Sequence, residues 1–187
     1  PQAFQEISDK YRLMQQAKAA GVAIPDTLFV PDGRVEEVLR EIADFPVVVK
    51  PGCSLVKDGR RWTKTSVCYA ESPEELLRLY RERAYLRQPS LIQRRVIGEG
   101  QGLFVLMQEG MPLGMFAHRR LRERPPSGGV SVLRESIALP KAMVEATLKL
   151  LQPVKWHGVA MVEFKVDTAT QRPVLMEING RFWGSLQ

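Results

Sequence analysis

Two apolar stretches near the end of the chain decide its fold: Val159-Ala160-Met161-Val162-Glu163-Phe164 and Val174-Leu175-Met176-Glu177-Ile178-Asn179. A short polar turn separates them, so we expect them to pair as a β-hairpin. Because side chains alternate along a strand, Glu177 and Asn179 share one face of the second stretch, and Glu163 interrupts the apolar pattern of the first. Pairing would bring these three residues together. Two carboxylates and an amide oxygen are hard ligands that suit Mg²⁺ and leave positions for phosphates and water.

The same spacing fits a simpler interpretation, in which Glu163 and Glu177 are both exposed on a solvated sheet face. The spacing alone gives the two interpretations equal weight. The choice between them depends on how the strands pair.

A second informative stretch lies upstream, at Phe45-Pro46-Val47-Val48-Val49-Lys50. It is apolar on both faces and predicts a central strand. Lys50 at its end either extends its ammonium group into solvent or neutralises a phosphate. Residues 51–64, PGCSLVKDGRRWTK, look like a long loop whose glycines and cations suit phosphates, with a solvated charged loop as the alternative.

The remaining pattern alternates between helix and strand signals. We expect helices over about 8–20, 34–43, 72–87 and 140–151. Ser72 and Pro73 form a strong helix start. We expect further strands over 27–30, 65–70, 90–96, 102–108, 112–120 and 130–137. This order predicts an α+β protein with two lobes and antiparallel pairing in the second.

Composition narrows the class of protein. The 187 residues are 44% hydrophobic and 26% charged, which is ordinary for a folded domain. No apolar run approaches the roughly 18 residues of a membrane span, so we expect no membrane partner. The net charge of +6 suits an anionic ligand. Cys53 and Cys68 lack metal-ligand spacing, which favours reduced thiols and a cytoplasmic location.

A basic run, His118-Arg119-Arg120-Leu121-Arg122-Glu123-Arg124, leaves three interpretations open. It could bind nucleic acid, although aromatic residues for base stacking are sparse around it. It could be a charged strand end. One or two of its arginines could also face a phosphate.

The order of these motifs resembles the ATP-grasp superfamily of carboxylate ligases, over nearly the whole chain. The motifs that carry the resemblance are Asp9-Lys10, Pro46 to Pro51, Leu91 to Val96 with Gly98-Glu99-Gly100, Val162-Glu163-Phe164, and Met176 to Arg181. Within the superfamily, the run from Glu177 to Ser185 is most similar to carbamoyl-phosphate-synthase-like proteins and carboxylate–amine ligases.

The resemblance implies a role for each matching residue. Lys10 and Lys50 would contact nucleotide phosphates, and Lys50 and Arg181 would serve the phosphoryl transfer. Glu163, Glu177 and Asn179 would hold Mg²⁺, with Mn²⁺ as a possible substitute. The nucleotide would also be bound by the segment between the lobes, through Gln93, Arg94, Val96 and Glu99. Residues 51–64 match the position of a lid over the phosphates.

The resemblance also implies a whole architecture and reaction. We expect a leading helix at 1–24, a lid lobe at 25–92, a metal and phosphate lobe at 93–187, and a nucleotide cleft between the two lobes. The chain would be part of a longer ligase that uses ATP to activate a carboxylate as an acyl phosphate and joins it to an amine. The alternatives are a nucleotide-binding module without ligase activity and, in another class, a basic nucleic-acid-binding domain.

Overall fold

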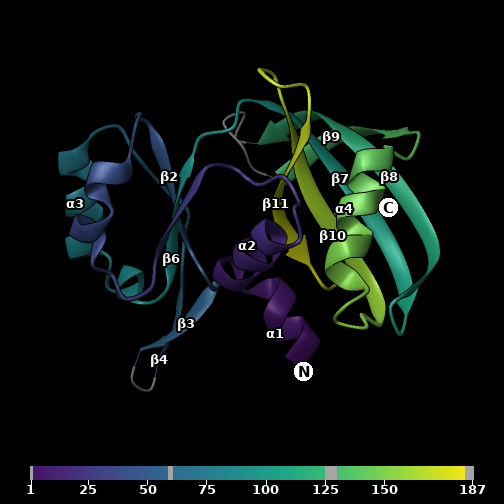
Figure 1. Ribbon diagram of the computed structural model, residues 1–187, viewed down its shortest axis with the longest axis horizontal. Coiled ribbons are helices and arrows are strands. Elements are labelled where there is room, and N and C mark those ends of the chain that lie inside the picture. Colours follow the sequence, from purple (N-terminus) through teal and green to yellow (C-terminus); the bar gives the residue numbers. More distant parts are fainter. Residues whose placement is uncertain (1, 59–60, 125–129, 184–187) are drawn as a thin grey trace. The chain divides into compact units, whose positions relative to one another are not determined.

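The computed structural model describes residues 2–58, 61–124 and 130–183. Its internal contacts divide the chain into two units, each built around an antiparallel sheet (Figure 1). The 25–95 unit comprises Asp9–Gln15 and Pro25–Arg95, and the 96–187 unit comprises Pro1–Ser8, Gln16–Ile24 and Val96–Gln187. The expectation of an α+β chain with antiparallel pairing in its second part is confirmed, and the sheet of the first part is antiparallel as well.

The 25–95 unit holds a sheet in the strand order β1-β6-β2-β5. The strands are β1 (Thr27–Val30), β2 (Val47–Pro51), β5 (Cys68–Ala70) and β6 (Ser90–Arg94). β2 pairs with a neighbour on each side, and its three valines are buried. The prediction of a central strand at this position is therefore confirmed.

Helix α3 (Pro73–Glu82) covers one face of this sheet. Ser72 caps it, because the Ser72 hydroxyl accepts a hydrogen bond of 3.3 Å from the Glu75 amide, and Pro73 opens the first turn. Leu76 and Tyr80 of the helix pack into the core that Val47 and Val49 form from the sheet. The 3₁₀ turn η3 (Ala84–Arg87) follows the helix.

Two predictions about this unit are wrong. Residues 34–43 form two 3₁₀ turns, η1 (Val35–Glu37) and η2 (Leu39–Glu41), in place of one helix. No side-chain hydrogen bond caps either turn, and β-branched side chains lose rotamer freedom in a helix.

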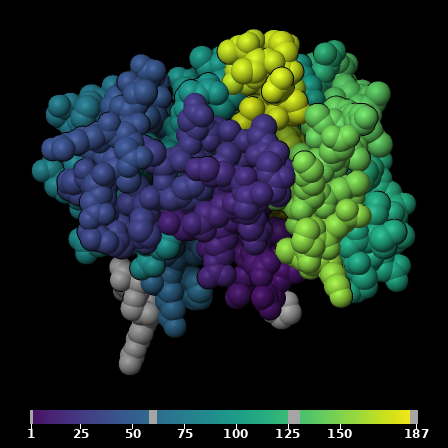
Figure 2. Space-filling view, in the orientation of Figure 1, coloured from purple at the N-terminus to yellow at the C-terminus, as the bar shows by residue number. Residues whose placement is uncertain are grey.

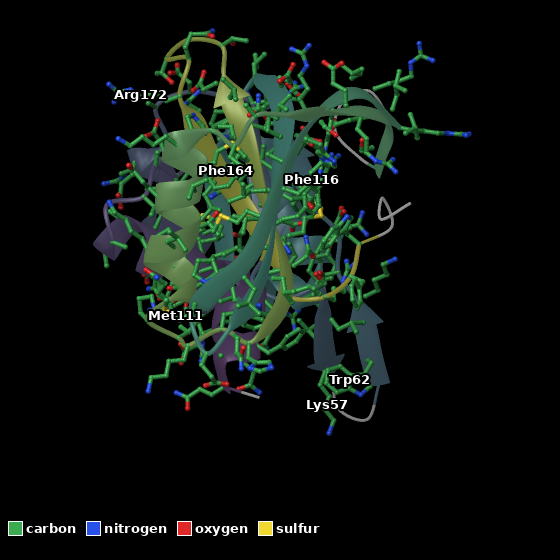
Figure 3. The ribbon with its side chains drawn as sticks, turned by 90° about the vertical axis from the view of Figure 1, so that its right-hand side faces the viewer. Lys57, Trp62, Met111, Phe116, Phe164 and Arg172 are labelled. Carbon is green, nitrogen blue, oxygen red and sulfur yellow. The ribbon has the colours of Figure 1, made fainter. Side chains whose placement is uncertain are left out.

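The second error concerns residues 51–64, which form a two-stranded hairpin of β3 (Leu55–Asp58) and β4 (Arg61–Lys64) where a loop was expected. The strands contain β-branched and aromatic residues that favour extended backbone. The Thr65 amide closes the base of the hairpin by donating to the Ser54 carbonyl at 3.0 Å. The hairpin extends from the body of its unit (Figures 1 and 2), and Trp62 on it is 68% exposed (Figure 3).

The 96–187 unit holds a sheet in the order β11-β10-β7-β8-β9. Its strands are β7 (Gly98–Gln108), β8 (Met111–Arg124), β9 (Val130–Ile137), β10 (Gly158–Asp167) and β11 (Pro173–Asn179). The expected hairpin of β10 and β11 is present, with Glu163 directly opposite Glu177.

Helix α4 (Lys141–Leu151) covers one face of this sheet, which we call the α4 face. Buried residues on that face include Leu103, Val162 and Phe164. Figure 3 shows Phe164 on the α4 side of the sheet and Phe116 on the other side. The core of the unit therefore lies between α4 and the sheet, and the second face is left to carry polar side chains.

The helix predicted over about 8–20 is present as α2 (Lys10–Ala19), and a second helix that was not predicted, α1 (Gln2–Ser8), precedes it. The Asp9 carboxylate accepts from the amides of Tyr11 and Arg12 and so caps α2. A turn with Gly21 follows the helix, and its φ of 66° suits glycine. Among the described residues, no helix is long and apolar enough to cross a membrane.

Candidate functional site

The two glutamates of the β10–β11 hairpin and Asn179 form one cluster on the face of the sheet opposite α4, which we call the carboxylate face. Asn179 Nδ2 donates to Glu163 Oε1 at 3.1 Å and to Glu177 Oε1 at 3.0 Å. The Glu163 side chain is only 18% exposed. The interpretation with both carboxylates on a solvated face is therefore wrong for Glu163.

The two carboxylates of this cluster lie close together in a largely buried place. Burial, and next the charge of Glu177, raises the pKa of Glu163 to about 7, although Arg120 acts in the opposite direction. An Arg120 Nη2 hydrogen bond to Glu163 Oε2 and a 3.0 Å bond from Arg120 Nη1 to Glu123 Oε1 hold that guanidinium in place. A cation between the two glutamates would favour the ionised form of both.

The residues present fit a magnesium ion. Both carboxylates point to the same amide, so their oxygens converge on one position. The Asn179 side chain presents its nitrogen to them, and rotation of the amide exchanges nitrogen for oxygen. Hard oxygen donors of this kind are the ligands that Mg²⁺ prefers. No group of three or more His, Cys, Asp or Glu suited to a metal occurs within residues 2–58, 61–124 and 130–183, so this set depends on the amide as its third member.

Arg181 extends the cluster beyond Asn179. Its Nη2 donates to Asn179 Oδ1 at 3.4 Å, and its Nη1 donates to the Phe182 carbonyl at 3.0 Å. Arg181 itself is exposed. An exposed guanidinium beside buried carboxylates is placed to contact an anionic ligand.

One member of the site, Arg120, could not be singled out from the sequence. Arg120 was one of several arginines in the basic run, and the structure puts this one against Glu163. Its side chain is 12% exposed, and its Nε is buried without a hydrogen-bond partner. A Cβ on Gly100 would lie 2.9 Å from Arg120 Cδ, so glycine at that position leaves room for the arginine. The sequence feature that could have indicated this position is the alternation of Gly98, Gly100 and Gly102 along one strand face, which leaves room for a large side chain from the neighbouring strand.

The two lysines expected to contact phosphates come from neighbouring segments of the 25–95 unit. The Lys10 amide donates to the Gly52 carbonyl at 2.7 Å, two residues after Lys50. A Cβ on Gly52 would lie 3.0 Å from both Asp9 Oδ1 and the Pro89 carbonyl oxygen, so glycine permits this close approach. Lys50 is partly buried at the end of β2.

Gln93 shares a sheet face with Lys50, since it pairs with Val48 on the neighbouring strand. Its side chain is 1% exposed, and its Nε2 donates to Thr27 Oγ1 at 2.9 Å. Its Oε1 is buried without a hydrogen-bond partner. A buried acceptor of this kind usually has a partner, so Gln93 is a candidate to accept from a ligand N–H.

The other residues expected at the nucleotide have structural partners. Arg94 Nε contacts Asp26 Oδ2 at 3.1 Å. The Val96 carbonyl accepts from Lys165 Nζ at 3.3 Å. Glu99 accepts from Gln101 Nε2 at 2.8 Å, on the face away from Glu163. The nucleotide roles of these residues stay predictions.

Arg119, next to Arg120, is paired on the α4 face. It contacts the Glu135 carboxylate and lies 3.9 Å from Glu99. With Arg119 and Arg120 both engaged by glutamates, the basic run presents less free charge than its sequence indicates.

No protein-family model matches the sequence, and no curated protein matches it closely. Solved structures are similar in fold. D-alanine–D-alanine ligase from Bacillus anthracis, complexed with ATP, aligns with a TM-score of 0.61 at 21% identity over 93% of this chain and 55% of its own. A RiPP-associated ATP-grasp ligase from Chryseobacterium gregarium, complexed with ADP and a leader and core peptide, gives 0.71 at 16% identity over 98% of this chain and 55% of its own.

A third similar structure is the biotin carboxylase–β,γ-ATP complex from Campylobacter jejuni. It has a TM-score of 0.73 at 18% identity, over 98% of this chain and 42% of its own. The chain thus spans about half of the length of these structures. Across almost all of its length, the chain has the ATP-grasp fold.

Proposed function

We propose that the chain binds Mg·ATP and is the nucleotide-binding part of a ligase that activates a carboxylate as an acyl phosphate and joins it to an amine. The observation that carries this proposal is the cluster of Glu163, Glu177 and Asn179, with Arg120 and Arg181 beside it. It combines converging carboxylates with cations for an anionic ligand. ATP-grasp structures solved with ATP or ADP support the choice of nucleotide.

The reaction would proceed in two displacements. A carboxylate oxygen of the substrate attacks the γ-phosphorus of ATP, the bond to the bridging oxygen breaks, and ADP leaves. The amine nitrogen then attacks the acyl carbon, inorganic phosphate leaves, and the nitrogen loses a proton. In such transfers the protein mainly positions the reactants and stabilises charge.

Each group of residues would have its own role in this reaction. Glu163, Glu177 and Asn179 would hold Mg²⁺, which when bound neutralises charge on the phosphate oxygens. Arg181 would stabilise charge on the transferring phosphoryl group. Lys10 and Lys50, which belong to the 25–95 unit, would bind phosphates of the nucleotide.

The buried Gln93 Oε1 would accept a hydrogen bond from an adenine amino group, which would satisfy its missing partner. The β3–β4 hairpin would act as the lid over the phosphates, since lids exclude water from reactive intermediates. Both thiols, Cys53 and Cys68, are free, which supports a reducing, cytoplasmic environment.

Thermal unfolding with and without Mg·ATP tests the proposal. A ligand that binds only the folded state stabilises it, by about 2.7 kcal/mol at 100 times its Kd. We expect Glu177→Gln to lose at least about tenfold in Mg·ATP affinity. The ligand-free variant should stay folded, since the substitution keeps the shape and removes the charge that raises the pKa of Glu163.

Glu135→Gln is the matched control. Glu135 lies in the same sheet, is 43% exposed and pairs with Arg119 on the α4 face. It should bind Mg·ATP as the unmodified chain does. Equal affinities in Glu177→Gln and Glu135→Gln would refute the metal site. Stabilisation by Mg·ATP without ADP release, with carboxylates and amines present, would favour the nucleotide-binding module without ligase activity.

A further inference from the structure

A cavity within the 25–95 unit lies between the β3–β4 hairpin and the turn η3. Its volume is about 320 Å³, which is near the lower limit for small-molecule sites in proteins. Every residue that lines it belongs to this one unit. Val56, Lys57 and Thr63 line it from the hairpin, and Arg83, Tyr85 and Arg87 line it from the chain that follows α3.

Positive charge predominates around this cavity. Three cations, Lys57, Arg83 and Arg87, line it together with one carboxylate, Glu82, and all four residues are exposed. Within the part of the chain that the structure describes, none of the three cations forms an ion pair. Cations that the protein itself does not neutralise attract an anion, and the fork of a guanidinium group matches the oxygens of a phosphate.

The wall that η3 forms is fixed by its contacts with the rest of the unit. Leu86 in the middle of η3 is fully buried in the core. A Cβ on Gly33 would lie 2.9 Å from Arg87 Cα, so glycine at that position lets the backbone of η3 pack closely. The Tyr85 hydroxyl is hydrogen-bonded to the Ser66 hydroxyl at 3.0 Å. The arginines on this wall therefore extend from an ordered backbone, which lowers the entropy that binding costs.

The opposite wall is one face of the hairpin. Val56 and Thr63 pair directly across its two strands, so they share that face, whereas Trp62 lies on the other face (Figure 3). The strands β3 and β4 pair with each other in a separate two-stranded sheet. A two-stranded sheet is only marginally stable without further contacts. An anion held between Lys57 and the arginines would therefore add a contact that ties the hairpin to the body of its unit.

The cavity is separate from the phosphate contact proposed for Lys50. Side chains alternate along β2, so Val47 and Val49 pack into the core beneath α3, whereas Lys50 lies on the other face of the sheet. Tyr85, which lines the cavity, packs against the core beneath α3. The cavity and Lys50 therefore belong to different faces of the same sheet.

We propose that this cavity binds a small phosphate-bearing anion, and that the bound anion holds the β3–β4 hairpin against η3. Phosphate oxygens would accept hydrogen bonds from the guanidinium groups of Arg83 and Arg87 on one side and from the Lys57 ammonium group on the other. The site goes beyond the proposed function, which gives no role to Arg83 or Arg87.

Inorganic pyrophosphate, titrated against the full chain by calorimetry without Mg²⁺, is the probe. We expect a Kd below about 1 mM, and no binding at that concentration would overturn the proposal. Arg87→Gln and Lys57→Gln should each weaken binding by about fivefold or more, because each removes one charge-assisted contact at an exposed position. Amide hydrogen exchange in β3 and β4 should slow when pyrophosphate is bound, and an unchanged exchange rate would refute the tie between the hairpin and η3.

Arg81→Gln is the matched control, since Arg81 is an exposed residue of α3 that does not line the cavity. It makes the same change in net charge and should bind pyrophosphate as the unmodified chain does. Equal affinities in Arg87→Gln and Arg81→Gln would overturn the proposal.

Lys50→Ala distinguishes this cavity from the proposed nucleotide site. It should bind pyrophosphate as the unmodified chain does. A loss in Lys50→Ala without a loss in Arg87→Gln would assign the pyrophosphate to the nucleotide site and overturn the proposal. Stabilisation by Mg·ATP, measured on the same samples, should persist in Arg87→Gln. Its absence from the unmodified chain would refute the proposed function, whereas the cavity is judged by pyrophosphate alone.

Discussion

Replacement of Gly102 by alanine is a direct test of how tightly the carboxylate face is packed. Gly102 lies in β7 between Glu163 and His118. An added Cβ would lie 2.9 Å from Phe104 Cζ and 3.1 Å from His118 Nε2. Phe104 has little room to move, because it is 3% exposed and packs against Phe116, His118 and Trp183. The added methyl group therefore has to displace a packed aromatic ring.

The magnitude follows from two opposing effects. Overpacking of a well-packed site costs about 1–3 kcal/mol. Replacing glycine with alanine also restricts the unfolded chain, which stabilises the fold by about 0.4–1 kcal/mol. We expect Gly102→Ala to destabilise the chain by about 1–2 kcal/mol.

Gly114→Ala is the control that carries the unfolded-state effect without the overpacking. Gly114 lies on the neighbouring strand β8, and a Cβ there would meet no heavy atom within 4 Å. This variant should be as stable as the unmodified chain or more stable by up to about 1 kcal/mol. The unfolded-state contribution cancels between the two variants, so the difference between them should be about 1–3 kcal/mol.

Urea unfolding followed by circular dichroism gives the free energy of unfolding of each variant. The near-ultraviolet spectrum, which reports on aromatic packing, should change in Gly102→Ala and stay unchanged in Gly114→Ala. Equal stabilities of the two variants, with unchanged aromatic spectra, would refute the packing described for Phe104 and His118.

Two further outcomes are expected. Lys50→Ala should weaken binding of ATP by about tenfold or more and leave adenosine binding unchanged, because it removes the charge-assisted contact to phosphate that we propose for Lys50. Lys141→Ala, at a lysine that is 91% exposed, should alter neither affinity in a titration. The pKa of His118 is about 4 in the folded chain and 6.5 in the unfolded chain, so the unfolded chain binds more protons between these pH values. The free energy of unfolding should therefore fall by on the order of 3 kcal/mol as the pH drops from about 6.5 to about 4. His118→Phe should make this decline smaller in urea unfolding at pH 7 and 4.5, and an identical decline would contradict a buried neutral histidine.

Local pattern was enough to predict most of the strands and the helix α4. The valines of β2, the alternating residues of β10 and β11, and the cap at Ser72 each express their structure within a few residues of sequence. The same patterns indicated that Glu163 and Glu177 could meet, since a hairpin pairs strands that are adjacent in the chain. For such features the sequence alone is sufficient, because the interactions that decide them are short in range.

The hairpin of β3 and β4 shows where local pattern failed. Its charged and glycine-containing residues have the composition of a loop, yet Leu55–Asp58 pairs with Arg61–Lys64. The 3₁₀ turns at 35–41 show the opposite error, since helical spacing of apolar residues did not produce a helix. In both places backbone pairing or packing against the core outweighed the local preference.

The composition of the site depended on the tertiary structure. Arg120 is one of four arginines in the basic run. Only the register of β8 against β7, and of β7 against β10, places it at Glu163. The same register aligns Phe104 and Phe116 with Asn179 across four strands. A shift of one residue would move every one of these side chains to the other face of the sheet. Sequence periodicity determined which residues lie on a strand, whereas long-range strand pairing decided which of them meet, because that choice depends on the packing of the whole sheet against α4.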